Sequence, residues 1–234
     1  MIKAIGFDLD DTLYDRNSVY RRVFENMQDH FPADISFEVF NSVYQAYSKS
    51  YYRAYMNGDC DKLYYQLQRT IDSYRDFDYT IDNELAQKFL DLYEGNKKEL
   101  ELRPYFHDCL VQLKQSPIEI FVLTNGARSG QSSKISSLKL NQYFDPNRMW
   151  ISEDLGCSKP ASEIFEQVTQ RLGYQANEIL YVGDDLTNDI KGSLDHGWQA
   201  LYFNVHNKPA DIEHPHLSIA EDESSLYEQL LAYI

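Results

Sequence analysis

The sequence predicts an α/β protein, in which a parallel β-sheet is covered by helices on both faces and carries an all-helical insertion. Short apolar runs alternate with helical segments over residues 1–15 and 97–234, and this alternation is typical of parallel strands joined by right-handed crossovers. Residues 16–96 instead show helical periodicity throughout. We therefore predict two domains, a sheet domain formed by 1–15 and 97–234 and a helical domain formed by 16–96.

The strands are predicted from apolar, β-branched runs that end in turn-forming or acidic residues. The first run stops abruptly at the acidic turn that begins with Asp8, which marks the end of a buried strand. The later runs are almost continuously apolar, as expected of parallel strands with both faces covered. The predicted strands are Ile2–Phe7, Ile118–Leu123, Met149–Ser152, Ile179–Val182 and Gln199–Phe203.

The helices are predicted from apolar residues spaced three or four apart. In the insertion this spacing indicates four amphipathic helices, with breaks at 32–36, 57–61 and 76–82, and we expect most of their tyrosines to be buried. Pro160 is expected in the first turn of the helix that Gly173 ends. The later helices are predicted at 105–114, 131–140, 159–173, 188–196 and 224–233.

Composition and charge restrict the possible partners. The net charge of -15 argues against a nucleic-acid polymer, which clustered Lys and Arg would recognise, and against an anionic membrane surface. A small anionic substrate remains compatible, because a bound metal and one or two cations can dominate locally. The three cysteines are widely spaced, and no apolar run is long enough to cross a bilayer, so we expect a reduced cytoplasmic protein without a signal peptide.

Polar side chains follow four of the predicted strands. The carboxyl ends of parallel strands meet at one edge of a sheet, and ligands bind beyond that edge. We therefore expect these side chains to converge on one site. They are Asp8 and Asp10 after the first strand, Thr124, Asn125 and Gly126 after the second, Lys159 after the third, and Asp184, Asp185 and Asp189 after the fourth.

The acidic residues suit a magnesium-assisted transfer of a phosphoryl group. Asp8 and Asp10 share one face of an extended chain and repel each other unless a cation lies between them. Magnesium is a hard cation that takes oxygen ligands, and Asp184 would complete its ligands with Asp8 and Asp10. Asp8 is placed to attack phosphorus, and Asp10 to protonate the leaving alcohol and then activate water. Asp189 would orient these ligands from outside.

The remaining polar residues suit the phosphate group. The Thr124 hydroxyl and the amides of Asn125 and Gly126 can bind phosphate oxygens, and Lys159 can offset the charge of the carboxylates and of the transferring group. Structural alternatives stay open for each of them. The Asp-rich and Thr-Asn-Gly segments can be ordinary turns, a lone lysine is often a solvated surface residue, and Asp185 suits either a partner of the metal ligands or a helix cap.

Four segments together resemble the ordered motifs of the haloacid dehalogenase-like hydrolases. They read DLDDT at 8–12, LTNG at 123–126, SKP at 158–160 and GDDLTND at 183–189. The resemblance implies a Rossmann-like, doubly wound core with a helical cap inserted after the first strand, dependence on Mg²⁺, and an aspartyl-phosphate intermediate on Asp8. LTNG, ISEDLG and SKPASEIF are also similar to the pyrimidine 5'-nucleotidase and N-acylneuraminate phosphatase branches. Because true dehalogenases lack the second aspartate and need no metal, Asp10 and Asp184 speak against dehalogenation.

The leading hypothesis is a magnesium-dependent phosphatase acting on a small phosphorylated metabolite, a nucleoside monophosphate or a sugar phosphate, as a monomer or homodimer. Closure of the helical cap would exclude water, and Tyr14, Tyr20, Tyr51 and Tyr55 are candidates to face the substrate. The first alternative is a phosphomutase or phosphotransferase that uses the same aspartyl-phosphate. The second is a non-enzymatic regulator that accepts a phosphoryl group.

Overall fold

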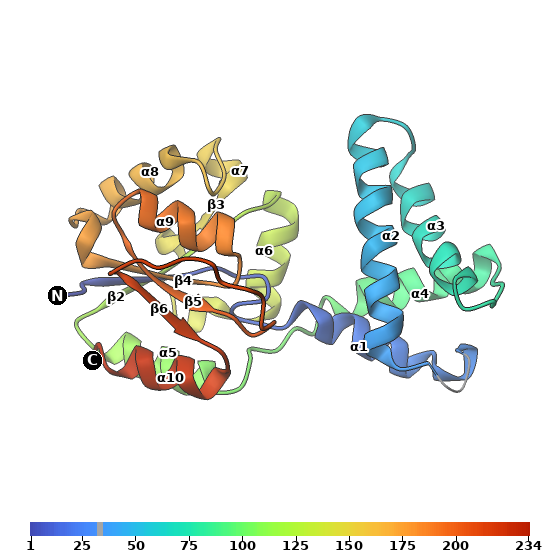
Figure 1. The fold of residues 1–234 in the computed structure, drawn as a ribbon, viewed down its shortest axis with the longest axis horizontal. Coiled ribbons are helices and arrows are strands. Elements are labelled where there is room, and N and C mark those ends of the chain that lie inside the picture. Colours follow the sequence, from blue (N-terminus) through green and yellow to red (C-terminus); the bar gives the residue numbers. More distant parts are fainter. Residues whose placement is uncertain (32–34) are drawn as a thin grey trace. The chain divides into compact units, whose positions relative to one another are not determined.

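The computed structural model describes residues 1–31 and 35–234, and the chain forms two compact units (Figure 1). The sheet unit comprises Met1–Arg16 and Leu100–Ile234, and the helical unit comprises Asn17–Glu99. Each unit is described by itself below. The predicted helix break at 32–36 falls partly outside the described residues.

The described part of the sheet unit contains a six-stranded, fully parallel sheet in the order β3-β2-β1-β4-β5-β6. From β1 the chain adds β2 and then β3 on one side, and it then adds β4, β5 and β6 on the other side. The strand order therefore reverses between β1 and β4, and doubly wound sheets bind their ligands beyond the strand ends at such a switch point. The strands are β1 Ala4–Phe7, β2 Glu119–Thr124, β3 Met149–Ile151, β4 Ile179–Gly183, β5 Gln199–Phe203 and β6 Leu217–Ala220.

Helices cover both faces of this sheet, so the predicted α/β fold class is confirmed. Figure 1 shows α5 and α10 on one face and α8 and α9 on the other. The strands β1 and β4 are buried along their whole length, as continuous apolar runs predict. The α-helices are α5 Phe106–Gln115, α6 Arg128–Ser137, α7 Ser152–Leu155, α8 Ser162–Leu172, α9 Gly192–Asp195 and α10 Glu223–Leu231, with 3₁₀ turns at Leu140–Gln142, Pro146–Arg148 and Ala176–Glu178.

Several predicted helix boundaries are wrong. The helix expected to begin at Lys159 and Pro160 begins at Ser162, because the Lys159 backbone pairs with the Asn125 side chain instead of entering a helix. Its predicted end at Gly173 is confirmed, and Gly173 has the left-handed conformation of a helix terminus. The helix expected at 131–140 spans Arg128–Ser137, and the one expected at 188–196 is a π-helical turn, Leu186–Lys191, followed by α9.

Two short elements escaped prediction. The strand β6 pairs only with β5 at the edge of the sheet, and its central residues Ser218 and Ile219 are exposed, so it lacks the apolar run that identifies the inner strands. The helix α7 is a single turn of four residues that follows β3 directly. Neither segment is long enough for its periodicity to be recognised.

The helical unit consists of amphipathic helices packed around an aromatic core. Ser36, Asp61 and Asp82 cap the starts of α2, α3 and α4, because each side chain accepts a hydrogen bond from a backbone amide three residues later. The helices are α1 Arg16–Asn26, α2 Phe37–Asn57, α3 Lys62–Arg75 and α4 Asn83–Asn96, with a 3₁₀ turn at Gln28–His30. Their buried aromatic residues are Tyr20, Phe24, Phe31, Phe37, Phe40, Tyr44, Tyr74 and Phe89.

Three of the four tyrosines predicted to face a substrate lie in the helical unit and have partners there. Tyr20 is buried against Tyr44 and Tyr93, with ring centroids 5.2 and 4.8 Å away. The Tyr51 hydroxyl donates to Asp72, and Tyr55 stacks on Tyr65 at 5.7 Å between centroids. These contacts account for the three rings as parts of the helical bundle.

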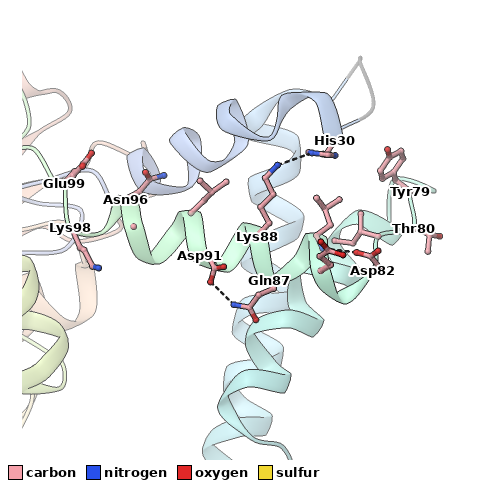
Figure 2. Close-up of a pocket in the computed structure, with 15 residues that line it drawn as sticks. His30, Tyr79, Thr80, Asp82, Gln87, Lys88, Asp91, Asn96, Lys98 and Glu99 are labelled. Atoms are coloured by element: carbon pink, nitrogen blue, oxygen red, sulfur yellow. Dashed lines mark hydrogen bonds between the residues drawn. The ribbon is translucent and has the colours of Figure 1, made fainter.

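An open groove of about 1250 Å³ runs beside α4 in the helical unit (Figure 2). Its lining mixes charges of both signs, and Lys88 Nζ lies 3.3 Å from His30 Nε2 at one edge. None of the residues predicted to form the active site lines this groove. Among the described residues, no helix combines the length and apolarity needed to cross a membrane.

Candidate active site

Asp8 lies one residue beyond the end of β1, next to β4, where the strand order reverses. It is 7% exposed, and its Oδ1 accepts a hydrogen bond from Lys159 Nζ at 2.7 Å. Burial raises the pKa of Asp8 to about 8, and the charge of Asp189 adds to this effect while Lys159 opposes it. The carboxyl group of Asp8 is therefore costly to ionise unless further positive charge lies nearby.

Lys159 is the buried cation of the site. Burial opposes its charge, but the carboxylates of Asp189 and Asp8 prevail and raise the pKa of Lys159 well above its usual value. The ammonium nitrogen also contacts the Tyr181 hydroxyl at 2.7 Å and the Leu123 carbonyl at 3.1 Å, and it lies 2.6 Å from Asp189 Oδ1. With 3% of its surface exposed, Lys159 is not the solvated lysine of the structural alternative.

Asp8, Asp184 and Asp189 form an oxygen-rich cluster in which one carboxylate oxygen of each lies within 4.8 Å of the others. Burial, together with the charges of Asp11 and Asp189, raises the pKa of Asp184 to about 7. The nearest cation to Asp184 in the described ion pairs is Lys208, 3.9 Å away and half exposed. Crowded carboxylates with this donor chemistry fit a hard divalent cation such as Mg²⁺.

A second group of possible ligand atoms, from Asp11, Asp184 and His206, shares Asp184 with the first. The carboxylate of Asp11 is already engaged, because it accepts from the Arg16 amide at 2.9 Å and pairs with the Arg16 guanidinium at 2.9 Å. The proximity of Asp11 and His206 to Asp184 is not evident from their positions in the sequence.

Asp10 points to a different set of partners from those of Asp8. Lys134 Nζ lies 2.6 and 2.7 Å from its two oxygens, Gln131 Nε2 donates to Oδ2 at 3.0 Å, and the Tyr14 hydroxyl donates to Oδ1. Burial opposes ionisation, but Lys134 and these hydrogen bonds prevail and lower the pKa of Asp10 below its usual value. The Asp10 carboxylate does not belong to either group of possible metal ligands among the described residues.

The Thr-Asn-Gly segment after β2 is organised by neighbouring side chains. Thr124 is buried, and its Oγ1 accepts from Gln131 Nε2 at 2.6 Å. The Gly126 amide donates to Ser152 Oγ at 3.0 Å, so this predicted phosphate donor is engaged within the protein. The Asn125 side chain binds the backbone of Lys159 through both its oxygen and its nitrogen, at 2.9 and 2.8 Å.

Asp185 and Asp189 have distinct structural roles. The Asp185 carboxylate accepts from the amides of Thr187 and Asn188 at 2.9 and 2.8 Å, so Asp185 acts as a helix cap, one of its two predicted roles. Asp189 is 2% exposed and links Lys159 to the Asp185 amide, which donates to Asp189 Oδ2 at 3.0 Å.

Sequence reasoning missed Gln131, Lys134 and Tyr181. Gln131 and Lys134 are three residues apart on α6 and therefore share a helix face, a signal that could have been noticed once the helix was placed correctly. Tyr181 lies inside β4, and its position in an apolar run predicts an ordinary core residue. The contact between its hydroxyl and Lys159 is visible only in the folded structure.

A parallel sheet with charged side chains beyond its strand ends is typical of α/β enzymes, and comparison with known proteins identifies the family of this chain. The model of the haloacid dehalogenase-like hydrolases matches residues 5–202, and the chain belongs to this family. The earlier recognition of the superfamily from four motifs is therefore confirmed.

Individual relatives are similar over most of the chain. A glyceraldehyde 3-phosphate phosphatase of Methanocaldococcus jannaschii is 30% identical over 206 residues, which cover 84% of this chain and 82% of that protein. An N-acylneuraminate-9-phosphatase of Rattus norvegicus is 28% identical over 209 residues, covering 85% and 81%. The crystal structure of the putative hydrolase YfnB from Bacillus subtilis, bound to magnesium, is 25% identical with a TM-score of 0.68 and covers 98% of both chains.

Proposed function

We propose that this protein is a magnesium-dependent phosphatase that hydrolyses a phosphomonoester of a small metabolite through an aspartyl-phosphate on Asp8. The observation that carries the proposal is the group of buried Asp8, Lys159 and Asp189 with half-buried Asp184 at the carboxyl ends of the strands. Residues that are far apart in the sequence and individually unfavourable to bury are brought together there, which is common at functional sites.

The side chains divide the reaction into two steps. One Asp8 carboxylate oxygen is held by Lys159, so the other attacks phosphorus, and the bond between phosphorus and the leaving oxygen breaks. Asp10, ionised in the free enzyme because Lys134 lowers its pKa, takes up a proton when the anionic phosphate binds and gives this proton to the departing alkoxide. Water then attacks the phosphorus of the aspartyl-phosphate while Asp10 takes the water's proton, which releases inorganic phosphate and restores Asp8.

The positive groups offset the charge that builds up during transfer. The Lys159 ammonium forms ion pairs with Asp8 and Asp189, and from this position it can also stabilise phosphoryl oxygens. Mg²⁺ held by Asp8 and Asp184, with the Asp10 backbone carbonyl as a further ligand, would neutralise negative charge between the enzyme and the phosphate. Asp189 then orients Lys159, and Thr124 donates its hydroxyl to a phosphate oxygen.

The substrate class that we propose is a nucleoside monophosphate or a sugar phosphate. The similar proteins support a small phosphorylated metabolite, since those named above are phosphatases of glyceraldehyde 3-phosphate and of an N-acylneuraminate 9-phosphate. Asp10 distinguishes the site from one that displaces halide, because halide leaves without a proton.

The test measures release of phosphate from a panel of nucleoside monophosphates and sugar phosphates, with Mg²⁺ and with EDTA. We expect Asp8→Asn to abolish turnover, because the nucleophile is lost, and EDTA to suppress it. Asp211→Asn, an exposed aspartate of the same unit, is the matched control and should keep full activity. Activity that survives Asp8→Asn contradicts the covalent mechanism. Isomerised phosphosugar in place of free phosphate would identify a mutase instead.

A further inference from the structure

We propose that Gln131 and Lys134 of α6 are positioning residues, which together hold Asp10 and Thr124 in the arrangement needed to protonate the leaving group. This inference rests on the proposed function, since it assigns Asp10 as the proton donor. Neither residue belongs to the four motifs, and both make their contacts through side-chain nitrogens at the site itself.

Lys134 fixes the Asp10 carboxylate by contacting both of its oxygens. The ammonium nitrogen lies 2.6 Å from Oδ1 and 2.7 Å from Oδ2, and both side chains are largely buried, at 19% and 23% exposed. A charge-assisted contact to both oxygens restricts rotation of the carboxyl group. Proton transfer requires the carboxyl oxygen to stay within hydrogen-bond reach of the leaving oxygen, so this restriction favours the reactive geometry.

Gln131 connects Asp10 with Thr124 through a single amide nitrogen. Nε2 carries two hydrogens, one donated to Asp10 Oδ2 at 3.0 Å and one to Thr124 Oγ1 at 2.6 Å. Because the Thr124 oxygen accepts from Gln131, its own hydrogen remains to be donated to a phosphate oxygen. The amide therefore sets the distance between the proton-transfer group and the phosphate-binding hydroxyl.

The local backbone is shaped to admit Gln131. Gly126 has a φ of +146°, and a Cβ at this position would lie 3.0 Å from both Cγ and Cδ of Gln131. A side chain at 126 would therefore push Gln131 away from Thr124 and Asp10. The glycine of the Thr-Asn-Gly segment is explained by this close approach as well as by its backbone conformation.

The burial pattern of α6 favours a functional role over simple helix packing. Of the residues of α6, all of which are described, only Gln131 is buried, with 3% of its surface exposed. An apolar residue would anchor a helix without the cost of desolvating an amide. Here the anchoring side chain is polar and directs both of its donors to Asp10 and Thr124.

The test compares two esters that differ in their need for a proton. An alkyl phosphate must have its leaving oxygen protonated, whereas p-nitrophenolate leaves as a stable anion. We expect Lys134→Met and Gln131→Leu to lower kcat/KM for the alkyl phosphate by about 10- to 100-fold, the range typical of residues that orient a reacting group. The value for p-nitrophenyl phosphate should fall far less in Lys134→Met, as it should in Asp10→Asn. Gln131→Leu also releases Thr124, so it should lower the value for p-nitrophenyl phosphate as well, but less than that for the alkyl phosphate.

Controls separate this role from folding and from phosphate binding. Lys134→Arg keeps the charge and should recover most of the alkyl-ester activity, and Lys139→Met, an exposed lysine just beyond α6, should match the wild type. The double variant of Lys134→Met with Asp10→Asn should hydrolyse the alkyl phosphate no more slowly than Asp10→Asn alone, because both changes remove the same step. Should Gln131→Leu fail to fold, the Lys134 series carries the test by itself.

Equal losses on both esters in Lys134→Met would overturn the inference, because they would indicate direct contact with phosphate or general misfolding. Unchanged kcat/KM in Lys134→Met would overturn it as well. Failure of the proposed function is a separate result, in which the wild type hydrolyses neither ester or Asp8→Asn remains active.

Discussion

Burial of each charged side chain at this site would be unfavourable if it were alone, and it is offset by the opposite charges of the others. Asp8, Asp184 and Asp189 lie together with Lys159 as their buried cation, and Lys159 contacts only two of the three. In the described ion pairs, the nearest cation to Asp184 is Lys208, 3.9 Å away. A divalent cation bound among these carboxylates would favour their ionised form, which is the physical reason for expecting metal binding and stability to be coupled.

The raised pKa of Asp184 predicts a pH-dependent stability with a definite sign. In the absence of divalent cations the folded state keeps a proton on Asp184 up to about pH 7, whereas the unfolded state releases it near the usual value of 3.8. This group therefore contributes a fall in stability as pH rises from about 4 to about 7. Removing its charge should abolish that fall.

The measurement is the melting temperature in EDTA at pH 5 and pH 8. At each pH we subtract the melting temperature of the wild type from that of Asp184→Asn. We expect this difference to be several degrees larger at pH 8 than at pH 5. Added Mg²⁺ at pH 8 should raise the melting temperature of the wild type more than that of the variant. A difference independent of pH would show that burial of this carboxylate is not the cause.

At the level of elements, the site is built by the turns that follow the strands. β4 ends at Gly183, and the π-helical turn after it begins with Asp185 as its cap and brings Asp189 back beneath the end of the strand. This return is tight, because a Cβ on Gly183 would lie 2.4 Å from Asp189 Oδ2. The turn thus places Asp189 against Lys159 only if residue 183 has no side chain.

Gly183→Ala is therefore expected to displace Asp189 and weaken its contact with Lys159. We expect activity to fall by at least about 10-fold and the free energy of unfolding to fall by about 1–3 kcal/mol, as for other overpacked sites. Phosphatase assays and denaturant titration measure both quantities. Gly130→Ala is the matched control, since a Cβ there meets nothing within 4 Å and Ala favours a helix. Normal activity in Gly183→Ala would contradict the packing argument.

At the level of the whole molecule, the two units have separate apolar cores. The core of the helical unit contains Phe40, Tyr44 and Phe89, and a cluster of the sheet unit contains Phe165 and Trp198. Phe89 is 1% exposed and lies 5.2 Å from Tyr44 between ring centroids. Because each cluster is confined to one unit, a cavity in one core should act mainly on the stability of that unit.

Phe89→Ala should destabilise the helical unit by about 3–5 kcal/mol, the usual cost of removing a buried phenyl ring. Hydrogen-exchange mass spectrometry should show faster exchange in peptides from 17–99, while peptides from β1, β2 and β4 keep their protection. Phe165 is fully buried in the sheet unit, and Phe165→Ala is the reciprocal variant. It should speed exchange in peptides of the sheet unit and leave the protection of the helical unit unchanged. Equal loss of protection in both units would mean that they unfold as one.

Much of the fold was predictable because local signals and tertiary structure agree. The strand β4 is a continuous apolar run that ends in Gly183 and Asp184, and the parallel sheet buries it completely. Prediction failed where a tertiary contact overrides the local pattern. Pro160 reads as the first turn of a helix, but the neighbouring Lys159 backbone is held by Asn125, so the helix begins at Ser162.

The sequence by itself determined the fold class, the family and the acidic and basic residues that follow the strands, because apolar periodicity and motif order are properties of the chain. Only the tertiary structure decided how those residues pair. It joined Asp8 to Lys159 and Asp10 to Lys134, and it placed Gln131 against Thr124. The physical reason is that hydrogen bonds and ion pairs depend on distances across the folded chain, which residue spacing along one strand or helix does not specify.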